Sequence, residues 1–314
     1  EIQIPWHTIQ KRTRGFCTGA TRKEVMAMPG EERPVSPDLS ENIAALRSTM
    51  RAERNKDFVA RPFMCMGAEA CAMFLEGMAG SDFLDDDVLR PLMKHAPVER
   101  VSPGKRAGYL LACAIPMSQG QLSRDLNALA EELVNGQTVI FLDGCDEAIL
   151  LDTRKYDMRP VMNPRTEAVV IGAQEGFVEN LRTNITLVRR YLRSSALITE
   201  PMSVGTKIPT RCALLYLDGV ANEAVVARVR QKIAAIDAPH ALNCGALAQL
   251  LEPRPFLIFP QILQTERPDR TVAALTGGQV AILMDNAPYA LILPTTLFDL
   301  LHASDDSFMR WQYG

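Results

Sequence analysis

The chain has 314 residues, of which 47% are hydrophobic and 23% charged, and its formal net charge at pH 7 is −3. This balance excludes wholesale disorder, and the length predicts about two domains. The small negative charge excludes the basic surface of a dedicated nucleic-acid-binding protein, so no nucleic-acid partner is expected. No stretch of the sequence approaches the 18 consecutive apolar residues typical of a membrane-spanning helix.

The predicted elements begin after residues 1–37, a polar and basic stretch that we interpret as an arm or linker. Apolar residues recur at helical spacing over residues 39–50, which predicts a first helix. Residues 70–75 form a short apolar run before a Glu-Gly pair, typical of a strand that ends in a turn. Ser81 opens a second predicted helix, which we expect Pro91 to kink or end.

A third helix is predicted over residues 126–133, followed by two strands over residues 137–142 and 148–151. The pair Asp143-Gly144 between these strands is a typical hairpin turn. The continuous apolar runs indicate strands that are buried on both faces by packed helices. The first half of the chain therefore predicts a mixed sheet with helices on it.

The second half repeats the first. Residues 137–143 match residues 279–285, which is an offset of 142 residues, and residues 74–79 match residues 216–221 at the same offset. Apolar and polar residues of the first helix also match the region around residues 181–193 without a gap. A constant offset over three segments indicates duplication. We predict an α/β fold of mixed α+β character with two similar, duplicated lobes, each a mixed β-sheet with packed helices.

The expected domain organisation follows from this duplication. It comprises an N-terminal arm or linker over 1–37, a first lobe over 38–155, a connector over 156–174, a second lobe over 175–297 and an exit segment over 298–314. Because the sequence starts with Glu and stops without a tail, we expect a piece of a longer protein.

The second lobe opens with a helix predicted over about 176–193, which carries a stripe of arginines beside its apolar face. The stripe consists of Arg182, Arg189, Arg190 and Arg193. Such a stripe is either a solvated surface or a partner for nearby carboxylates, and the sequence supports both interpretations equally. In the second interpretation, the arginines pair with Glu266 or Asp269 and pin that loop to the helix.

No residue pattern indicates a catalytic or metal site. The histidines show no metal-binding spacing, and no nucleophile elbow, phosphate-binding loop or dinucleotide-binding fingerprint occurs. The seven cysteines form no Cys-x-x-Cys pair, which favours reduced thiols in a cytosolic protein. We expect no catalytic residue, no cofactor and no metal, and a hydrolase or transferase is the least supported function.

Three aspartates follow predicted strands, namely Asp143, Asp218 and Asp285. For Asp143 and Asp218, which precede glycine, turn chemistry is the favoured interpretation, because Asp-Gly is a common turn pair. Alternatively, these carboxylates line a ligand pocket between two hinged lobes, a hypothesis that rests on fold-level analogy. The segment over 172–179 likewise has two interpretations, a simple capped entry to the arginine-bearing helix, which is favoured, and an anion site made by exposed amides.

Several motifs run in an order typical of one family. They include Gly172-x-x-Glu175-Gly176-Phe177-x-Glu179, Asn184-x-x-Leu187-x-Arg189-Arg190, Tyr216-x-Asp218-Gly219, Phe259-Pro260-Gln261 and Thr265-Glu266-Arg267-Pro268-Asp269. From about residue 38 to its end, the sequence resembles the A subunit of the GerA-type spore germinant receptors, including its stage V sporulation relative. The sequence departs from the family at Ala173 and Gln174, where proline and a basic residue are usual, and this departure weakens the anion-site interpretation.

The resemblance implies a soluble N-terminal part that precedes a membrane part in a receptor of A, B and C subunits. It implies a location at the inner spore membrane, with this domain on the cytoplasmic or spore-core side and a membrane domain absent from this chain. The implied partners are the B and C subunits and other A subunits, which form a homo-oligomer around an ion path.

Our leading hypothesis is a non-enzymatic regulatory and assembly domain that acts in germination signal transduction and ion-channel gating. The alternative is a small-molecule-binding module with a ligand between the two lobes. We expect Gly172, Glu175 and Gly176 to set the junction of the lobes. The further predicted interface or switch residues are Glu179, Arg189, Arg190, Arg193, Glu266, Arg267 and Asp269.

Overall fold

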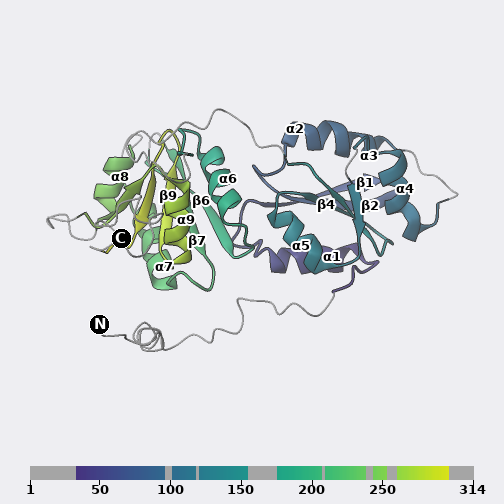
Figure 1. Cartoon of the computed structure of the whole chain (residues 1–314), viewed down its shortest axis with the longest axis horizontal. Coiled ribbons are helices and arrows are strands. Elements are labelled where there is room, and N and C mark those ends of the chain that lie inside the picture. The colour runs from purple at the N-terminus through teal and green to yellow at the C-terminus, as the bar shows by residue number, and fades with distance from the viewer. Residues whose placement is uncertain are drawn as a thin grey trace, which may run out of the picture. The chain divides into compact units, whose positions relative to one another are not determined.

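The computed structural model describes residues 33–95, 101–117, 120–154, 175–206, 209–237, 243–252 and 260–296. Within these residues, the strands form two five-stranded sheets, one in each half of the chain (Figure 1). Their strand orders are β1-β2-β4-β5-β3 and β6-β7-β9-β10-β8, so the second sheet repeats the first strand for strand. The predicted α/β fold with two duplicated lobes is therefore confirmed.

Both lobes combine helices and strands in nearly the same order. The first lobe contains α1 (Leu39–Thr49), β1 (Phe58–Cys65), β2 (Ala68–Leu75), α2 (Ser81–Phe83), the π-helical segment η2 (Leu84–Leu89), α3 (Arg90–Lys94), the 3-10 turn η3 (Pro103–Lys105), α4 (Arg106–Cys113), β3 (Gly120–Ser123), α5 (Leu126–Val134), β4 (Thr138–Leu142) and β5 (Ala148–Leu151). The second lobe contains α6 (Leu181–Tyr191), β6 (Leu197–Val204), β7 (Thr210–Leu217), α7 (Glu223–Ala234), α8 (Cys244–Leu251), β8 (Leu263–Thr265), α9 (Pro268–Thr276), β9 (Val280–Met284) and β10 (Ala290–Leu293).

The offset of 142 residues seen in the sequence is preserved in the structure. The bounds of α6, β7, α9, β9 and β10 are those of α1, β2, α5, β4 and β5 shifted by this amount at both ends. A pair of side-chain hydrogen bonds is repeated as well. The Asn42 side chain accepts from the Ser36 amide and donates to the Ser36 carbonyl, and the Asn184 side chain makes the same two bonds with Val178. The duplication therefore extends from element boundaries to individual hydrogen bonds.

The pairings between these named strands are antiparallel, so the expected mixture of parallel and antiparallel strands within a sheet is wrong. The expectation rested on continuous apolar runs, such as the fully buried strand β4. Helices cover both faces of each sheet, so an antiparallel central strand is buried on both sides just as a parallel one is. An apolar run therefore does not discriminate between the two kinds of pairing.

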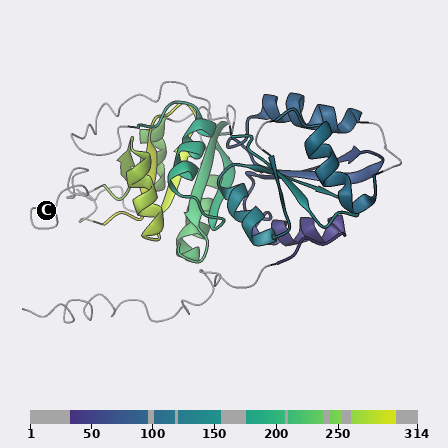
Figure 2. The ribbon, with the colours of Figure 1, turned by 45° about the vertical axis from the view of Figure 1, so that its right-hand side comes forward.

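Each sheet has two apolar layers. In the first lobe, α1 and α5 pack on one face, while η2, α3 and α4 pack on the other. In the second lobe, α7 and α8 cover one face, and α6 and α9 cover the other (Figures 1 and 2). Each of these four buried clusters draws its residues from a single lobe. Each lobe therefore has its own hydrophobic core.

Two predicted helices differ in detail from the structure. The chain winds without a break from Ser81 through η2 to Lys94, so Pro91 does not end the helix, and the wider π-helical turns lie directly before it. Helix α6 begins at Leu181 rather than near residue 176, because Asn180 has an extended backbone and caps the helix by accepting a hydrogen bond from the Thr183 amide.

Several predicted segments lie outside the described residues. The arm over 1–37 is described only from residue 33 onward, and the connector over 156–174, which contains Gly172, is not described. The exit segment over 298–314 is not described either. The boundaries of the lobes stay predictions.

Candidate functional site at the junction of the lobes

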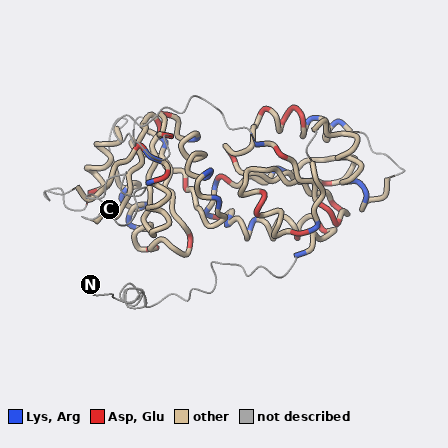
Figure 3. The backbone as a smooth tube through the Cα atoms, viewed as in Figure 1, with Lys and Arg blue, Asp and Glu red and all other residues tan. Residues whose placement is uncertain are grey.

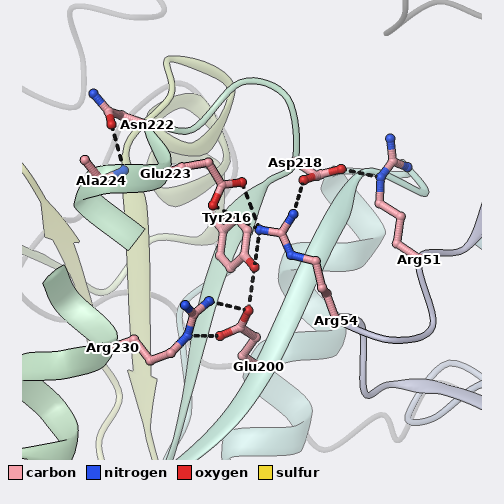
Figure 4. A network of polar contacts seen from close by, with 9 residues as sticks. All are labelled: Arg51, Arg54, Glu200, Tyr216, Asp218, Asn222, Glu223, Ala224 and Arg230. Carbon is pink, nitrogen blue, oxygen red and sulfur yellow. Dashed lines mark hydrogen bonds and ion pairs between the residues drawn. The ribbon is translucent and has the colours of Figure 1, made fainter. Parts of the chain in front are cut away.

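The loop that follows α1 of the first lobe contacts the second lobe. Helix α1 ends at Thr49, and Arg51 has a left-handed backbone with φ of 50°, which turns the chain sharply. The Arg51 Nε then lies 2.5 Å from one carboxylate oxygen of Asp218, and the Arg54 Nη1 lies 2.6 Å from the other (Figure 4). Because Asp218 directly follows β7, two arginines of the first lobe hold the end of a central strand of the second.

The Arg54 guanidinium makes further contacts with the second lobe. Its Nη2 lies 3.0 Å from the Tyr216 hydroxyl and 2.9 Å from a carboxylate oxygen of Glu223, the first residue of α7. Hydrogen bonds to Glu223 and Tyr216 outweigh the effect of burial and raise the pKa of Arg54, so the group stays charged. One guanidinium thus joins three acceptors of the second lobe.

A chain of hydrogen bonds continues inward from Tyr216. Its side chain is fully buried, and its hydroxyl donates to Glu200 at 2.5 Å. Glu200 also accepts two hydrogen bonds from Arg230 of α7, at 2.9 and 2.8 Å. Burial and the Glu200 charge raise the pKa of Tyr216 to about 12. Burial disfavours the ionised form of Glu200, but the bonds from Arg230 and Tyr216 lower its pKa below the usual value.

Arg189 of α6 forms the second contact between the lobes. Only 3% of its side chain is exposed, and its Nε lies 2.8 Å from a carboxylate oxygen of Asp57 in the first lobe. The Nη2 donates to the Asn55 side chain at 2.9 Å and to the Thr199 hydroxyl at 3.0 Å. The Lys56 amide donates to the Thr199 carbonyl at 3.2 Å, which adds a backbone hydrogen bond between the lobes next to Arg189. Arg189 therefore contacts the first lobe, so for this arginine both sequence interpretations, a solvated surface and a pairing with Glu266 or Asp269, are wrong.

Helix α6 also contacts the first lobe nearer its N-terminal end, and its basic positions are coloured blue in Figure 3. Arg182 pairs with Glu76 at 2.6 Å, and the Thr186 hydroxyl lies 3.2 Å from the Gly77 carbonyl. Gly77 has a φ of +86°, and a Cβ there would lie 2.8 Å from the Thr186 oxygen. Glycine is required at this turn both for its backbone and for the close approach of α6.

The predicted switch residues near α9 form a separate cluster. Glu175 accepts from Arg190 at 3.4 Å and from the Tyr191 hydroxyl at 3.1 Å. Arg267, whose side chain is 1% exposed, binds both oxygens of Asp269, at 3.0 and 2.6 Å. The loop that contains Glu266 is held against the start of the second lobe by a backbone hydrogen bond, in which the Phe177 amide donates to the Glu266 carbonyl at 2.7 Å.

The remaining predicted residues lie apart from both clusters. Gly176 is buried, whereas Arg193 is exposed beyond the end of α6. Glu179 is exposed, and its carbonyl accepts from the Asn286 amide at 2.7 Å. The structure therefore pairs Glu175 with Arg190 and Arg267 with Asp269, joins the Glu266 carbonyl to Phe177, and leaves Arg193 exposed beyond the helix.

The three strand-end aspartates do not converge. Asp218 lies at the junction, whereas Asp285 accepts from the Leu181 amide at 3.2 Å at the start of α6. Strands β7 and β9 are antiparallel neighbours, so the residues that follow them lie at opposite ends of the sheet. Asp143 is exposed next to Glu69 at the start of β2, while the other end of β2 leads to the junction. These residues form no common pocket wall.

Among the described residues, no group of three His, Cys, Asp or Glu side chains lies close enough together to hold a metal ion. Within the same part of the chain, no helix is both long enough and apolar enough to cross a membrane. What the junction offers chemically is the recognition of cations by carboxylates and of carboxylates by guanidinium groups.

Comparison with known proteins identifies the family. Residues 45–314 match the family model described as Bacillus/Clostridium GerA spore germination protein. From Bacillus subtilis, the uncharacterized membrane protein YfkQ is 32% identical over 90% of this chain and 54% of its own length. Spore germination protein B1 of the same organism is 30% identical over 88% of this chain and 56% of its own. The chain thus spans about half the length of these relatives.

A solved structure supports the same conclusion. The crystal structure of the N-terminal domain of the A subunit of the Bacillus megaterium spore germinant receptor GerK3 superposes with a TM-score of 0.67 and 25% sequence identity. The match covers 85% of this chain and 99% of that one. The motifs, the two duplicated lobes and the match of the family model over most of the chain agree, and the chain belongs to the GerA family of spore germination proteins.

Proposed function

We propose that this chain is the N-terminal domain of a germinant receptor A subunit and that it transmits the nutrient signal through a movement at the junction of its lobes. Family membership and the likeness to the GerK3 domain support the assignment to a receptor. The polar nature of the junction supports the movement, because each apolar cluster belongs to one lobe and the bonds between lobes are ionic or polar.

Helix α6 is the element that would carry the signal. One part of its surface contacts the first lobe through Arg182, Thr186 and Arg189, and the adjacent Arg190 contacts Glu175. A shift of the first lobe would therefore act on the cluster around Glu175, Glu266 and Arg267, which we propose as the switch. This domain would be regulatory and non-enzymatic and would assist gating of an ion path.

The partners in this proposal are the B and C subunits of the receptor and further A subunits. The domain would lie on the spore-core side of the inner spore membrane, joined to a membrane domain that the present chain does not include. The longer relatives support this arrangement, since this chain spans about half of their length and one of them is named a membrane protein.

Charge reversal at the junction tests the proposal in the whole receptor. Arg54→Glu would place a carboxylate against Asp218 and Glu223 and open the junction by repulsion, with both cores left intact. We expect spores with this variant to lose most of their response to nutrients at unchanged receptor abundance, measured by immunoblot. Arg228→Glu makes the same charge change on an exposed turn of α7 and serves as the matched control. A wild-type nutrient response of Arg54→Glu spores at normal abundance would contradict the proposal.

A further inference from the structure

The guanidinium of Arg54 lies in a cradle that belongs entirely to the second lobe. Its acceptors are Asp218 Oδ1 at 2.6 Å, the Tyr216 hydroxyl at 3.0 Å and Glu223 Oε1 at 2.9 Å. The guanidinium carbon lies 5.3 Å from the centre of the Tyr216 ring. Two carboxylates, a hydroxyl and an aromatic ring around one planar cation form a typical arrangement for guanidinium recognition.

Contacts within the second lobe hold most of this cradle in place without Arg54. The buried Tyr216 is fixed by Glu200, which Arg230 holds through two hydrogen bonds (Figure 4). The Asp218 amide donates to the Ala196 carbonyl at 2.9 Å, which fixes the turn. Asn222 caps α7 by accepting from the Ala224 amide, so the backbone that carries Glu223 is fixed as well. The Tyr216 hydroxyl and the backbones that carry Asp218 and Glu223 would therefore keep their places if Arg54 withdrew.

The charges around Arg54 are balanced when one cation is bound there. Glu200 and Arg230 neutralise each other, and Arg51 neutralises one of the two carboxylates that Asp218 and Glu223 supply. With Arg51 of the first lobe still paired to Asp218, removal of Arg54 alone would leave one uncompensated negative charge at this site. The acceptors diverge, with Asp218 on one nitrogen of the guanidinium and Tyr216 and Glu223 on another. A planar fork satisfies them at the same time, whereas the ammonium group of an amine is a single point charge.

We propose that the second lobe carries a binding site for small guanidinium compounds, which Arg54 of the first lobe fills in the closed junction. A free guanidinium compound and the first lobe would then compete for the same acceptors. The proposal rests on the contacts at the junction and gives a definite ligand class to the idea of a small molecule bound between the lobes. It does not depend on the role in germination, so either idea can fail without the other.

Chemical rescue of Arg54→Ala tests the site. We would titrate the full chain carrying this variant with methylguanidinium chloride at millimolar concentrations and follow the unfolding midpoint by calorimetry and the binding heat by titration calorimetry. We expect a saturable rise of about 2 °C or more at ten times the dissociation constant, and no such rise for the wild type, whose site is filled. Methylammonium chloride should bind at least about tenfold more weakly, because it lacks the planar fork.

Three further variants test whether Asp218 and Glu223 bind the methylguanidinium. Arg54→Ala combined with Glu223→Gln should bind methylguanidinium more weakly, and a further Asp218→Asn change should abolish binding. Arg228→Ala, which removes an exposed arginine of α7, should respond as the wild type does. No saturable response of Arg54→Ala, an equal response to methylammonium or sodium chloride, or a response that survives loss of both carboxylates would overturn the proposal. Should Arg54→Ala fail to fold, Arg54→Gln, which keeps most of the side chain, replaces it.

Discussion

Arg189 lies against Asp57 across the junction of the two lobes, with its Nε 2.8 Å from the carboxylate and 3% of its side chain exposed. The residues are 132 positions apart in the sequence. The same guanidinium also satisfies Asn55, which is fully buried. A single side chain of α6 thus donates to the side-chain oxygen of the buried Asn55 and pairs with the partly buried Asp57, both of the first lobe.

Replacement of Arg189 by alanine should therefore destabilise the chain strongly. The variant leaves Asp57 with little solvent and no ion-pair partner, and loss of one member of a buried pair costs about 3–5 kcal/mol. Arg189→Lys should cost less, because lysine keeps the charge but loses the fork that reaches Asn55 and Thr199 together. Equilibrium unfolding in urea measures both free energies, with Arg228→Ala as the exposed control. Equal stability of Arg189→Ala and wild type would exclude this role.

Tyr216→Phe should lower the free energy of unfolding by about 1–2 kcal/mol, because Glu200 and Arg54 each lose one buried hydrogen-bond partner. The ring itself is tolerated at this place, since Phe74 occupies the equivalent position of the first lobe. The folded state raises the pKa of Tyr216 to about 12, above its ordinary value of 10. The stability from this group is thus complete below about pH 10 and is lost as pH rises toward 12.

The phenylalanine variant should accordingly lose less stability than the wild type between pH 10 and 12. Thermal unfolding at a series of alkaline pH values measures the two slopes. Tyr191→Phe tests the same linkage at a second tyrosine, because its pKa is also raised to about 12, through burial and Glu175. Parallel curves for Tyr216→Phe and wild type would show that this hydroxyl carries no such linkage.

Glu200 should control stability at acid pH in the opposite sense. Its pKa is lowered in the folded state, so its contribution is present above its ordinary value of 4.5 and is lost as pH falls through the lower folded value. Glu200→Gln should be less stable than wild type near neutrality, since Arg230 loses its charged partner, and should show a smaller further loss in acid. Denaturant unfolding at pH 7 and at pH 3 measures this difference. An acid loss as large as that of the wild type would contradict the assignment.

Gly77→Ala should be more harmful than Gly219→Ala, although the two glycines occupy equivalent turns. Both have a positive φ, of 86° and 78°, so alanine brings backbone strain of about 1 kcal/mol at each. Only at Gly77 would the new methyl group press on Thr186, at 2.8 Å. We expect Thr186→Ala to relieve the added part in the double variant. Calorimetry of the four variants gives the coupling energy, and a value near zero would contradict the close approach of α6.

The repeat made much of the fold predictable. Periodicity and apolar runs predicted α5, β4 and β5 to within a residue at each end, because these elements are buried and regular. The sequence pattern gave no indication of β1 and β6, which form one edge of each sheet. Pro62 and Pro201 and an irregular burial pattern hide their strand character. Edge strands have solvent on one side, so their composition is less constrained.

The junction was not predictable in the same way. The acceptors of Arg54 lie 162 to 169 residues away in the chain, and local spacing carries no information about contacts at that distance. A signal was present in the comparison of the halves, since Phe74 and Val88 of the first lobe correspond to Tyr216 and Arg230 of the second. A polar residue that replaces an apolar one in a repeat indicates a place where the copies have different neighbours.

Separation of the lobes would expose charged side chains, rather than apolar ones, to solvent. Since helices cover both faces of each sheet, the side chains uncovered at the junction would be chiefly arginines and carboxylates, which water solvates well. The described contacts that an opening would break, those of Arg54 and Arg189 among them, are polar and would add no apolar patch on which chains aggregate. The opening that we propose would therefore uncover polar contacts at the junction rather than the separate core of either lobe.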